Sequence, residues 1–477
     1  MIKLLTSLCI SFLSCCTYEN VNMPDLNAIY SDAAKQSDLH RNPIIVIPGI
    51  LGSQLYDQQS DQVIWGVYDS TFQGPNTPKS MRQVALPMSQ GTPLSQLTDN
   101  IISTKTLDRL RLKVVGIPVQ PRAYASILAT LGVGGYKDQD FAASGAIDYG
   151  DGHFSCFQFN YDWRRSNAEN AAKLDAFIKQ KKSFVRKNIK EKFGVDKKDI
   201  KFDIIAHSMG GLVARYYLRY GNQPIPKENN NLPILNWQGA KNVEKVILVG
   251  TPNNGSVIAF EQILQGQKFA PDWAKHLPFT NIPEYPSSVI GTYPSIYELL
   301  PRYRHKAIVD PSGKKTDIFN IDLWDKHNLG LLSDTNKKDL AWQLPHTVSP
   351  EKHRAIAYDH VKKCLHNAKK FHQSLDKKAK APSHLSITLI SGDSIQTKER
   401  VMFYPEENRT EDNYYTPGDG TVLRSSVLGD QRAGGDYKPG IDSVIDYTKA
   451  IFLPRDHLEL TRDVTFSDNV LHILLEE

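Results

Sequence analysis

Ser208 lies in a segment whose pattern is typical of a serine nucleophile. Residues 202–206 predict a buried strand, Ser208 follows in the pattern small-x-Ser-x-Gly, and an apolar helical run begins at Leu212. A serine in a tight turn between a strand and a helix presents its hydroxyl above the edge of the sheet. The residues two before and two after it must be small, because the turn presses them against neighbouring backbone, and Ala206 and Gly210 fulfil this requirement. An ordinary serine in such a turn is the alternative, but the flanking strand and helix favour a nucleophile.

Such a serine needs a histidine base and a carboxylate that orients the base. On this kind of turn the chain order is serine, acid, histidine, so the search is restricted to residues after Ser208. Asp419 lies between two glycines in a loop and is the leading acid, although a turn aspartate that caps local N–H groups has the same pattern. Asp393, just after a predicted strand, is the rival. His457 follows an apolar run and precedes the last helical segment, where the base is expected.

Catalysis by such a serine also needs two main-chain N–H groups that stabilise the negatively charged oxygen of the intermediate. Met209, directly after the serine, is the first expected donor. The second is expected from the loop 48–52, which follows the first predicted strand and has glycines at 49 and 52 that let its backbone approach the site. Ile50 is the predicted donor from this loop, although the same sequence could form no more than a tight turn.

The chain predicts a scaffold that positions these residues. Four short apolar runs end in turn residues and predict buried parallel strands over residues 44–47, 202–206, 246–249 and 385–390. Residues 168–193 and 353–377 have apolar side chains at helical spacing and lysines on the other face, which favours helices that cover a sheet over helices that bind a membrane. Strands that alternate with amphipathic helices predict an α/β fold with a mostly parallel sheet flanked by helices.

Four histidines in the second of these helices raise the question of a metal site. They lack the tight spacing of metal ligands, so we expect them on a solvated face: His353, His360, His366 and His372. We therefore expect no metal and no cofactor.

Two long stretches interrupt the alternation of strands and helices. Residues 52–155 and 256–345 are rich in aromatic side chains and lie between predicted core elements. This composition suits a cap over a binding cleft. Surface loops with a small core of their own would have a similar composition.

The N-terminal residues 1–16 have the layout of a short secretory signal, with one lysine, an apolar run and then small residues. The end of this segment resembles a lipoprotein cleavage box, with the lipid carried by Cys15 or Cys16, whereas an ordinary signal would lose both cysteines. We expect an exported protein, whether secreted, periplasmic or anchored as a lipoprotein. Cys156 and Cys364 would remain, either paired or as two buried thiols.

The composition limits the remaining classes. The chain has 477 residues with 57 Lys and Arg against 52 Asp and Glu, and this net charge of +5 is too small to indicate a nucleic-acid partner. Its 40% hydrophobic and 23% charged residues are ordinary for a globular protein and exclude wholesale disorder. No stretch past residue 20 has the roughly 18 apolar residues that a membrane-spanning helix needs, so we expect a water-soluble body. We expect a monomer.

Seven motifs follow one another in an order that identifies a family. They lie at residues 44–55, 161–164, 206–210, 250–256, 294–301, 418–422 and 456–459. In sequence and order they resemble the lecithin:cholesterol acyltransferase family, which includes the lysosomal phospholipase and the phospholipid:diacylglycerol acyltransferases. The resemblance implies an α/β-hydrolase domain over residues 43–475. It also implies a membrane-binding or lid-like insertion at residues 52–155 and a cap insertion at residues 256–345.

The same resemblance implies that Ser208, Asp419 and His457 form a catalytic triad, and that Ile50 and Met209 donate to the oxyanion. The match is loose between residues 55 and 161, and the disulfide of the animal members has no cysteine pair there. The residue at position 50 differs within the family, so an acceptor preference linked to this loop does not transfer.

The expected function is a serine acyl hydrolase or O-acyltransferase on lipid esters at a membrane or lipid surface. The alternatives are a general carboxylesterase or lipase on small or neutral esters, and a lipid-binding protein without catalysis on the same fold. The sequence does not decide between water and an alcohol as the acceptor of the acyl group.

Overall fold

A six-stranded parallel sheet forms the centre of the computed structural model, in the order β16-β13-β9-β8-β1-β7. The structure describes residues 23–36, 39–66, 77–107, 112–114, 117–119, 124–150, 153–226, 231–268, 284–345 and 348–477. The strands of the central sheet are β1 (Ile44–Ile47), β7 (Cys156–Gln158), β8 (Phe202–His207), β9 (Val243–Val249), β13 (Ser386–Gly392) and β16 (Lys449–Leu453). All of them run in one direction, so their carboxyl ends meet at one edge of the sheet. The four predicted strands are confirmed, with small differences at their ends.

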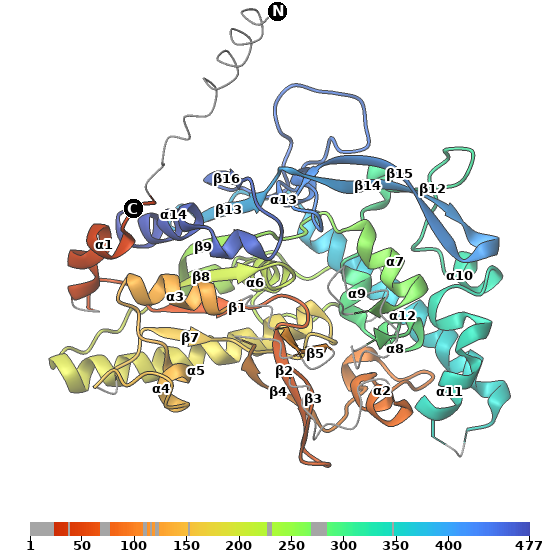
Figure 1. Cartoon of the computed structure of the whole chain (residues 1–477), viewed down its shortest axis with the longest axis horizontal. Coiled ribbons are helices and arrows are strands. Elements are labelled where there is room, and N and C mark those ends of the chain that lie inside the picture. The colour runs from red at the N-terminus through yellow and green to blue at the C-terminus, as the bar shows by residue number, and fades with distance from the viewer. Residues whose placement is uncertain are drawn as a thin grey trace, which may run out of the picture.

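Helices cover both faces of this sheet, because successive side chains of a strand point to opposite sides. Ile45 and Ile47 of β1 pack in the core with α5 (Asn167–Phe193), α6 (Gly210–Tyr220) and α12 (Pro350–Asp376). Ile44 and Val46 pack in a second core with α3 (Ala125–Val133) and α14 (Val464–Leu475). Figure 1 shows α3 and α14 near α1 (Leu26–Lys35), at the end of the molecule opposite α10 (Ile321–Lys326) and α11 (Lys337–Gln343). This arrangement is the predicted α/β-hydrolase architecture.

The two interrupting stretches form smaller elements of their own. Within residues 52–155 lie an antiparallel sheet of β2 (Ser53–Asp57), β3 (Gln62–Trp65) and β4 (Ile101–Thr106), the helices α2 (Pro78–Val84), α3 and α4 (Gln139–Ala143), and the pair β5 (Leu112–Val114) and β6 (Ile117–Val119). Within residues 256–345 lie α7 (Val257–Gln265), β10 (Gln267–Lys268), β11 (Glu284–Tyr285), α8 (Ser287–Ile290), α9 (Pro294–Glu298), β12 (Ile308–Val309), α10 and α11. Because α3 packs on the central sheet, the first stretch also contributes to the hydrolase core.

A long hairpin separates the last two core strands of the central sheet. β14 (Ile395–Tyr404) and β15 (Arg409–Gly418) pair with each other, and β14 also pairs with β12. Figure 1 shows this hairpin extending away from the central sheet. Its return strand ends at Gly418, so it delivers the following residue, Asp419, to the carboxyl edge of the sheet.

The predicted solvated face of α12 is wrong for three histidines. The side chain of His366 is exposed, but burial leaves 8% or less of the residue accessible at His353, His360 and His372. The reason is that α12 packs against α6, α9, α10 and α11 rather than against one surface. His360 Nε2 lies 2.9 Å from the Thr292 carbonyl oxygen, and His372 Nε2 lies 2.8 Å from that of Glu298.

Three further expectations meet the structure in different ways. Cys156 and Cys364 are both buried and both free, so the pairing that the sequence left open does not form. The predicted signal at residues 1–16, with Cys15 and Cys16, lies outside the described residues. Among the helices that the structure describes, none is long and apolar enough to cross a membrane.

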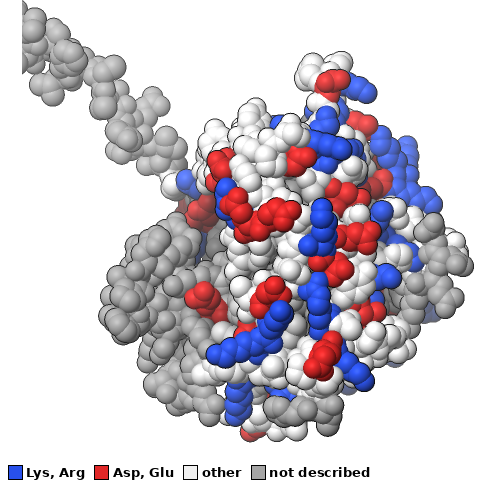
Figure 2. Space-filling model, turned by 90° about the vertical axis from the view of Figure 1, so that its right-hand side faces the viewer, with Lys and Arg blue, Asp and Glu red and all other residues white. Residues whose placement is uncertain are grey.

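One face of the molecule has both basic and acidic side chains over its middle. Figure 2 shows basic and acidic side chains interleaved over the middle of the face that forms the right-hand side of Figure 1. Exposed ion pairs bring basic and acidic side chains together at the surface, as Arg354 does with Asp325 and Lys337 does with Asp334. Such pairs contribute little stability each, because solvent screens them.

Candidate active site

Ser208 occupies a strained turn at the carboxyl end of β8. Its φ is +54°, a left-handed conformation that is uncommon outside glycine, and its N–H donates to the Val249 carbonyl oxygen over 2.7 Å. α6 begins two residues later, at Gly210, where an added Cβ would come within 2.8 Å of the Ile47 carbonyl oxygen. The requirement for small residues in the predicted turn therefore has a direct steric cause.

His457 lies between β16 and α14, and its ring joins the other two predicted residues. Its Nε2 lies 3.0 Å from Ser208 Oγ, and its Nδ1 lies 2.7 Å from Asp419 Oδ2. The His457 N–H also donates to the Asp419 carbonyl oxygen over 3.0 Å, so main chain and side chain hold the pair together. His457 is 9% exposed and Asp419 1%. The structure thus brings Ser208, Asp419 and His457 into one hydrogen-bonded chain.

The Asp419 carboxylate makes both kinds of contact that the sequence offered as alternatives, one with a histidine ring and one with the N–H groups of its own turn. Its Oδ2 faces His457, while its Oδ1 accepts the N–H groups of Thr421 over 3.0 Å and Val422 over 2.7 Å. These two donors cap the turn and fix the orientation of the carboxylate. The rival acid Asp393 pairs with Arg424 instead, and no hydrogen bond from Asp393 to His457 is found among the described residues.

The electrostatics of the pair favour an ionised Asp419 and make His457 more basic than a free histidine. Burial raises the pKa of the Asp419 carboxyl, but the charge and hydrogen bond of His457 and two main-chain donors outweigh it, so the pKa lies below its ordinary value. Burial lowers the pKa of His457, but the charge and hydrogen bond of Asp419 outweigh it and hold this pKa above the ordinary 6.5.

The loop 48–52 lies beside Ser208 and is held in place by side chains. Tyr161 Oη donates to the Pro48 carbonyl oxygen over 2.8 Å, and Trp65 Nε1 donates to the Leu51 carbonyl oxygen over 2.8 Å. The Ile50 and Met209 main-chain N–H groups have no acceptor among the described residues. An oxyanion site requires main-chain N–H groups without another acceptor, and these two meet that condition.

Tyr124 and His207 are two residues of this site to which sequence reasoning assigned no role. Tyr124 Oη accepts the Gly49 N–H over 2.7 Å and lies 3.3 Å from His207 Nδ1. His207 Nε2 lies 3.1 Å from the His457 carbonyl oxygen. His207 stands inside the nucleophile motif and could have been singled out there, whereas nothing in the local sequence marks Tyr124.

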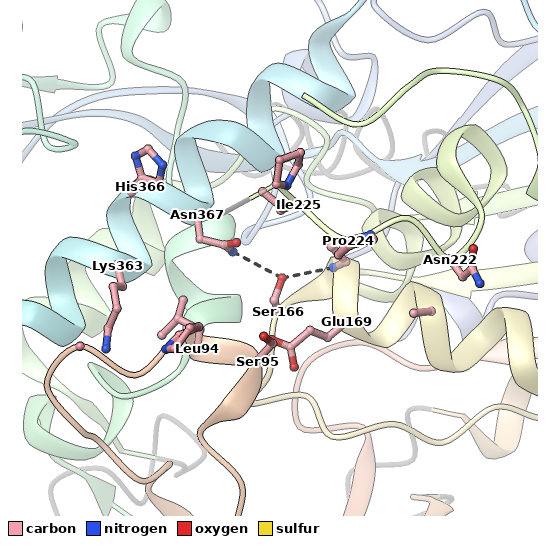
Figure 3. A pocket seen from close by; sticks show the side chains of 15 residues that line it. Leu94, Ser95, Ser166, Glu169, Asn222, Pro224, Ile225, Lys363, His366 and Asn367 are labelled. Carbon is pink, nitrogen blue, oxygen red and sulfur yellow. Dashed lines mark hydrogen bonds between the residues drawn. The ribbon is translucent and has the colours of Figure 1, made fainter. Parts of the chain in front are cut away.

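A cavity of about 470 Å³ lies elsewhere in the molecule, and none of the three triad candidates lines it. Figure 3 shows it between α5, α12 and the segments around Leu94 and Pro224. Two of its polar lining groups already have protein partners, since Ser166 Oγ donates to Glu298 over 2.6 Å and Lys363 pairs with Asp359. We therefore assign no chemistry to this cavity.

Known proteins give an independent view of the chain. The model of the lecithin:cholesterol acyltransferase family matches residues 154–437, more than half of the sequence. The solved structure of the Tle4–Tli4 complex is similar over 91% of this chain and 98% of that chain, with 16% identity and a TM-score of 0.53. No curated protein matches the sequence.

Two further solved structures align over similar lengths with lower TM-scores. Lipase 1 from Pelosinus fermentans aligns over 92% of this chain and 99% of its own, with 12% identity and a TM-score of 0.34. EstA from Clostridium botulinum aligns over 96% and 91%, with 11% identity and a TM-score of 0.31. The family match rests on sequence, and it agrees with the sheet order and the turn at Ser208. The chain belongs to the lecithin:cholesterol acyltransferase family and has its α/β-hydrolase fold.

Proposed function

We propose that this protein is a serine acyl hydrolase or O-acyltransferase that acts on lipid esters, of the phospholipase A or acyltransferase type. The observation that carries the proposal is the hydrogen-bonded chain from Asp419 through His457 to Ser208. Membership of the family supports the broader class, lipid ester hydrolysis or acyl transfer. The choice of lipid and the role of each residue are the parts that we propose.

Acylation follows from the distances between the three side chains. His457 Nε2 takes the proton of the Ser208 hydroxyl while Oγ attacks the ester carbonyl carbon, and Asp419 stabilises the imidazolium that forms. The carbonyl oxygen becomes an oxyanion, which the N–H groups of Ile50 and Met209 hold. The intermediate collapses when the alcohol part of the ester leaves with the proton of His457. The acyl group is then bound to Ser208 as an ester.

Deacylation uses the same groups in the opposite direction. Water or an alcohol gives its proton to His457 Nε2 and attacks the acyl carbon, and Ser208 leaves with that proton. Water releases a fatty acid, whereas a lipid or sterol hydroxyl yields a new ester. The outcome depends on how well the region above Ser208 excludes water.

The surroundings of Ser208 favour an apolar substrate. Leu458, next to the base, is 46% exposed, and Ile50 and Leu51 are half-buried beside the nucleophile. Exposed apolar side chains at the entrance to a site are suited to acyl chains. We propose that the protein is exported through residues 1–16, works as a monomer and meets its substrate at a lipid surface, with no nucleic acid or cofactor involved.

The test combines a covalent probe with product analysis. A fluorophosphonate probe should label the wild type and not Ser208→Ala. Ser391→Ala is the matched control, because this buried serine lies at the end of β13 and its hydroxyl has no hydrogen-bond partner among the described residues. Mass spectrometry of mixed phospholipid vesicles, with and without diacylglycerol or a sterol, then identifies the products.

The outcomes separate the candidate functions. Lysolipid with free fatty acid indicates a hydrolase, and a new acyl ester indicates a transferase. Turnover of short nitrophenyl esters with untouched vesicles would favour a general carboxylesterase and contradict the lipid proposal. A wild type that no probe labels would instead support a lipid-binding protein without catalysis.

A further inference from the structure

The loop 48–52 and the catalytic histidine are joined by a buried chain of three hydrogen bonds. The Gly49 N–H donates to Tyr124 Oη over 2.7 Å, Tyr124 Oη lies 3.3 Å from His207 Nδ1, and His207 Nε2 lies 3.1 Å from the His457 carbonyl oxygen. Tyr124 is 4% exposed and His207 3%, so water does not compete for these bonds. These bonds link the loop after β1 to the residue His457 after β16, although three other strands lie between β1 and β16 in the sheet.

The chemistry of the partners fixes the direction of each bond. The Tyr124 hydroxyl accepts from an N–H, so its own hydrogen is free to go to His207 Nδ1. His207 must then carry its proton on Nε2, from which it donates to the carbonyl oxygen of His457. Burial, together with the nearby His457, lowers the pKa of His207 to about 3, so the ring stays neutral over the working range. The tautomer and the order of donors are therefore determined.

This chain of hydrogen bonds restricts which residue can occupy position 52. A Cβ at Gly52 would come within 2.8 Å of Tyr124 Cε2 and Oη, so the tyrosine can reach the loop only because position 52 has no side chain. The rings of Tyr124 and His207 pack edge to face with centroids 5.6 Å apart, and those of His207 and His457 lie 4.9 Å apart. Tyr124, His207 and His457 are therefore held by ring packing as well as by hydrogen bonds.

We infer that Tyr124 and His207 are positioning residues, which hold the Ile50 donor and the His457 base in fixed register around Ser208. Gly49, at one end of this hydrogen-bonded chain, directly precedes Ile50, and the other end is the carbonyl oxygen of His457 itself. His207, within the chain, directly precedes Ser208. A displacement of about 1 Å at such a group can cost on the order of a hundredfold in rate. This inference rests on the proposed function, because it assigns these residues to the same reaction.

Tyr124→Phe is the sharpest test, since it removes one oxygen atom and keeps the ring. We expect kcat to fall about tenfold with KM nearly unchanged, because the donor for the oxyanion is displaced while substrate contacts remain. The rate of fluorophosphonate inactivation should fall by a similar factor. The pH midpoint of the acid limb of kcat/KM should stay in place, because the pair of His457 and Asp419 is untouched.

Tyr30→Phe is the matched control. Tyr30 is 3% exposed, and its hydroxyl donates to Asp468 over 2.7 Å between α1 and α14, away from the site. It should change thermal stability and leave kcat as it is. If Tyr124→Phe lowers the melting temperature as Tyr30→Phe does, but keeps wild-type kcat below the transition, then Tyr124 is merely structural and the inference is overturned.

Two variants of His207 examine the chain from its centre. His207→Gln can still donate toward the His457 carbonyl oxygen and loses the acceptor for Tyr124, whereas His207→Asn keeps that acceptor and loses the donor. Each should lower kcat, and Tyr124→Phe combined with His207→Gln should lose much less than the product of the single losses. If the two single losses of kcat multiply in the double variant, the two residues act independently, and the inference that the chain acts as one unit is overturned.

The proposed function and this inference fail in different ways. A wild type that hydrolyses no ester and reacts with no probe would overturn the proposed function, and the positioning role with it. An active wild type whose Tyr124→Phe variant keeps full kcat overturns the positioning role alone.

Discussion

Replacing Asp419 by asparagine tests the proposed triad at the atoms where the structure is most specific. Asparagine has nearly the same shape as aspartate, but one of its two oxygens becomes an NH₂ group. The N–H groups of Thr421 and Val422 both point at Oδ1, so they fix the amide with its oxygen on that side. The NH₂ group must then take the position of Oδ2, which lies 2.7 Å from His457 Nδ1.

This orientation moves the proton of the neutral His457 ring from Nδ1 to Nε2. A donor at Nδ1 forces the neutral His457 ring to carry its hydrogen on Nε2, which lies 3.0 Å from Ser208 Oγ. In that tautomer Nε2 can no longer accept the serine proton. The same replacement in a serine protease lowers kcat about 10⁴-fold, and we expect a loss on the order of 10³- to 10⁴-fold here.

The assay is kcat for a short nitrophenyl ester at a fixed pH near 8, with thermal unfolding measured on the same samples. Asp393→Asn is the matched control, because Asp393 pairs with Arg424 and not with His457. This replacement should change kcat less than twofold to threefold. The partly exposed ion pair that it removes contributes only about 0–1 kcal/mol to stability. A folded Asp419→Asn enzyme whose kcat lies within tenfold of wild type would contradict the proposed role of Asp419, and a large loss of kcat in Asp393→Asn would indicate that Asp393 is the acid.

Three more predictions follow from the site and its surroundings. Protonated His457 cannot accept the serine proton and its pKa is held above 6.5, so kcat/KM should fall as the pH drops through a midpoint above 6.5; a pH profile with a midpoint below 6 would contradict this. Gly211→Ala should cost about 1–3 kcal/mol in the free energy of unfolding, because its Cβ would lie 2.7–2.8 Å from Thr251 carbons, whereas Gly132→Ala in α3 meets open space and should stabilise by about 0.5–1 kcal/mol; chemical denaturation compares the two. Glu298→Leu leaves three buried donors and one half-buried donor without their acceptor and should lower the melting temperature by several degrees, and an unchanged melting temperature would show that those donors find other partners.

The sequence was most informative where structure is encoded locally. The turn at Ser208 could be predicted because a strand, a small-x-Ser-x-Gly pattern and a helix occupy about 20 consecutive residues. β1 was predicted with its observed bounds, Ile44–Ile47, because a fully buried strand is a short apolar run with turn residues after it. Such features depend on few distant contacts.

Features that depend on distant contacts could not be predicted in the same way. The choice between Asp393 and Asp419 turns on the hairpin of β14 and β15, which carries the chain away from the sheet after Asp393 and back to Asp419. Tyr124 meets Gly49 and His207 across 75 and 83 residues, and no local pattern announces either contact.

The histidines of α12 show a second kind of failure. Helical periodicity separates an apolar face from a polar one, and it assumes that the polar face meets water. α12 is enclosed by several helices, so its histidines satisfy their nitrogens with carbonyl groups of the chain, as His360 does with Thr292 and His372 does with Glu298. Neutral histidines are well suited to such positions, because burial lowers the pKa of both.

The separation of Ser208 from His457 by 249 positions along the chain gives the proposed nucleophile a second experimental use. Contacts across such distances form late and slowly in folding, because closing the intervening chain is costly in entropy. Reactivity of Ser208 with an active-site reagent therefore counts molecules in which the whole sheet from β1 to β16 has come together. Titration with such a reagent would measure the native fraction of any preparation, and its time course after dilution from denaturant would follow the completion of folding directly.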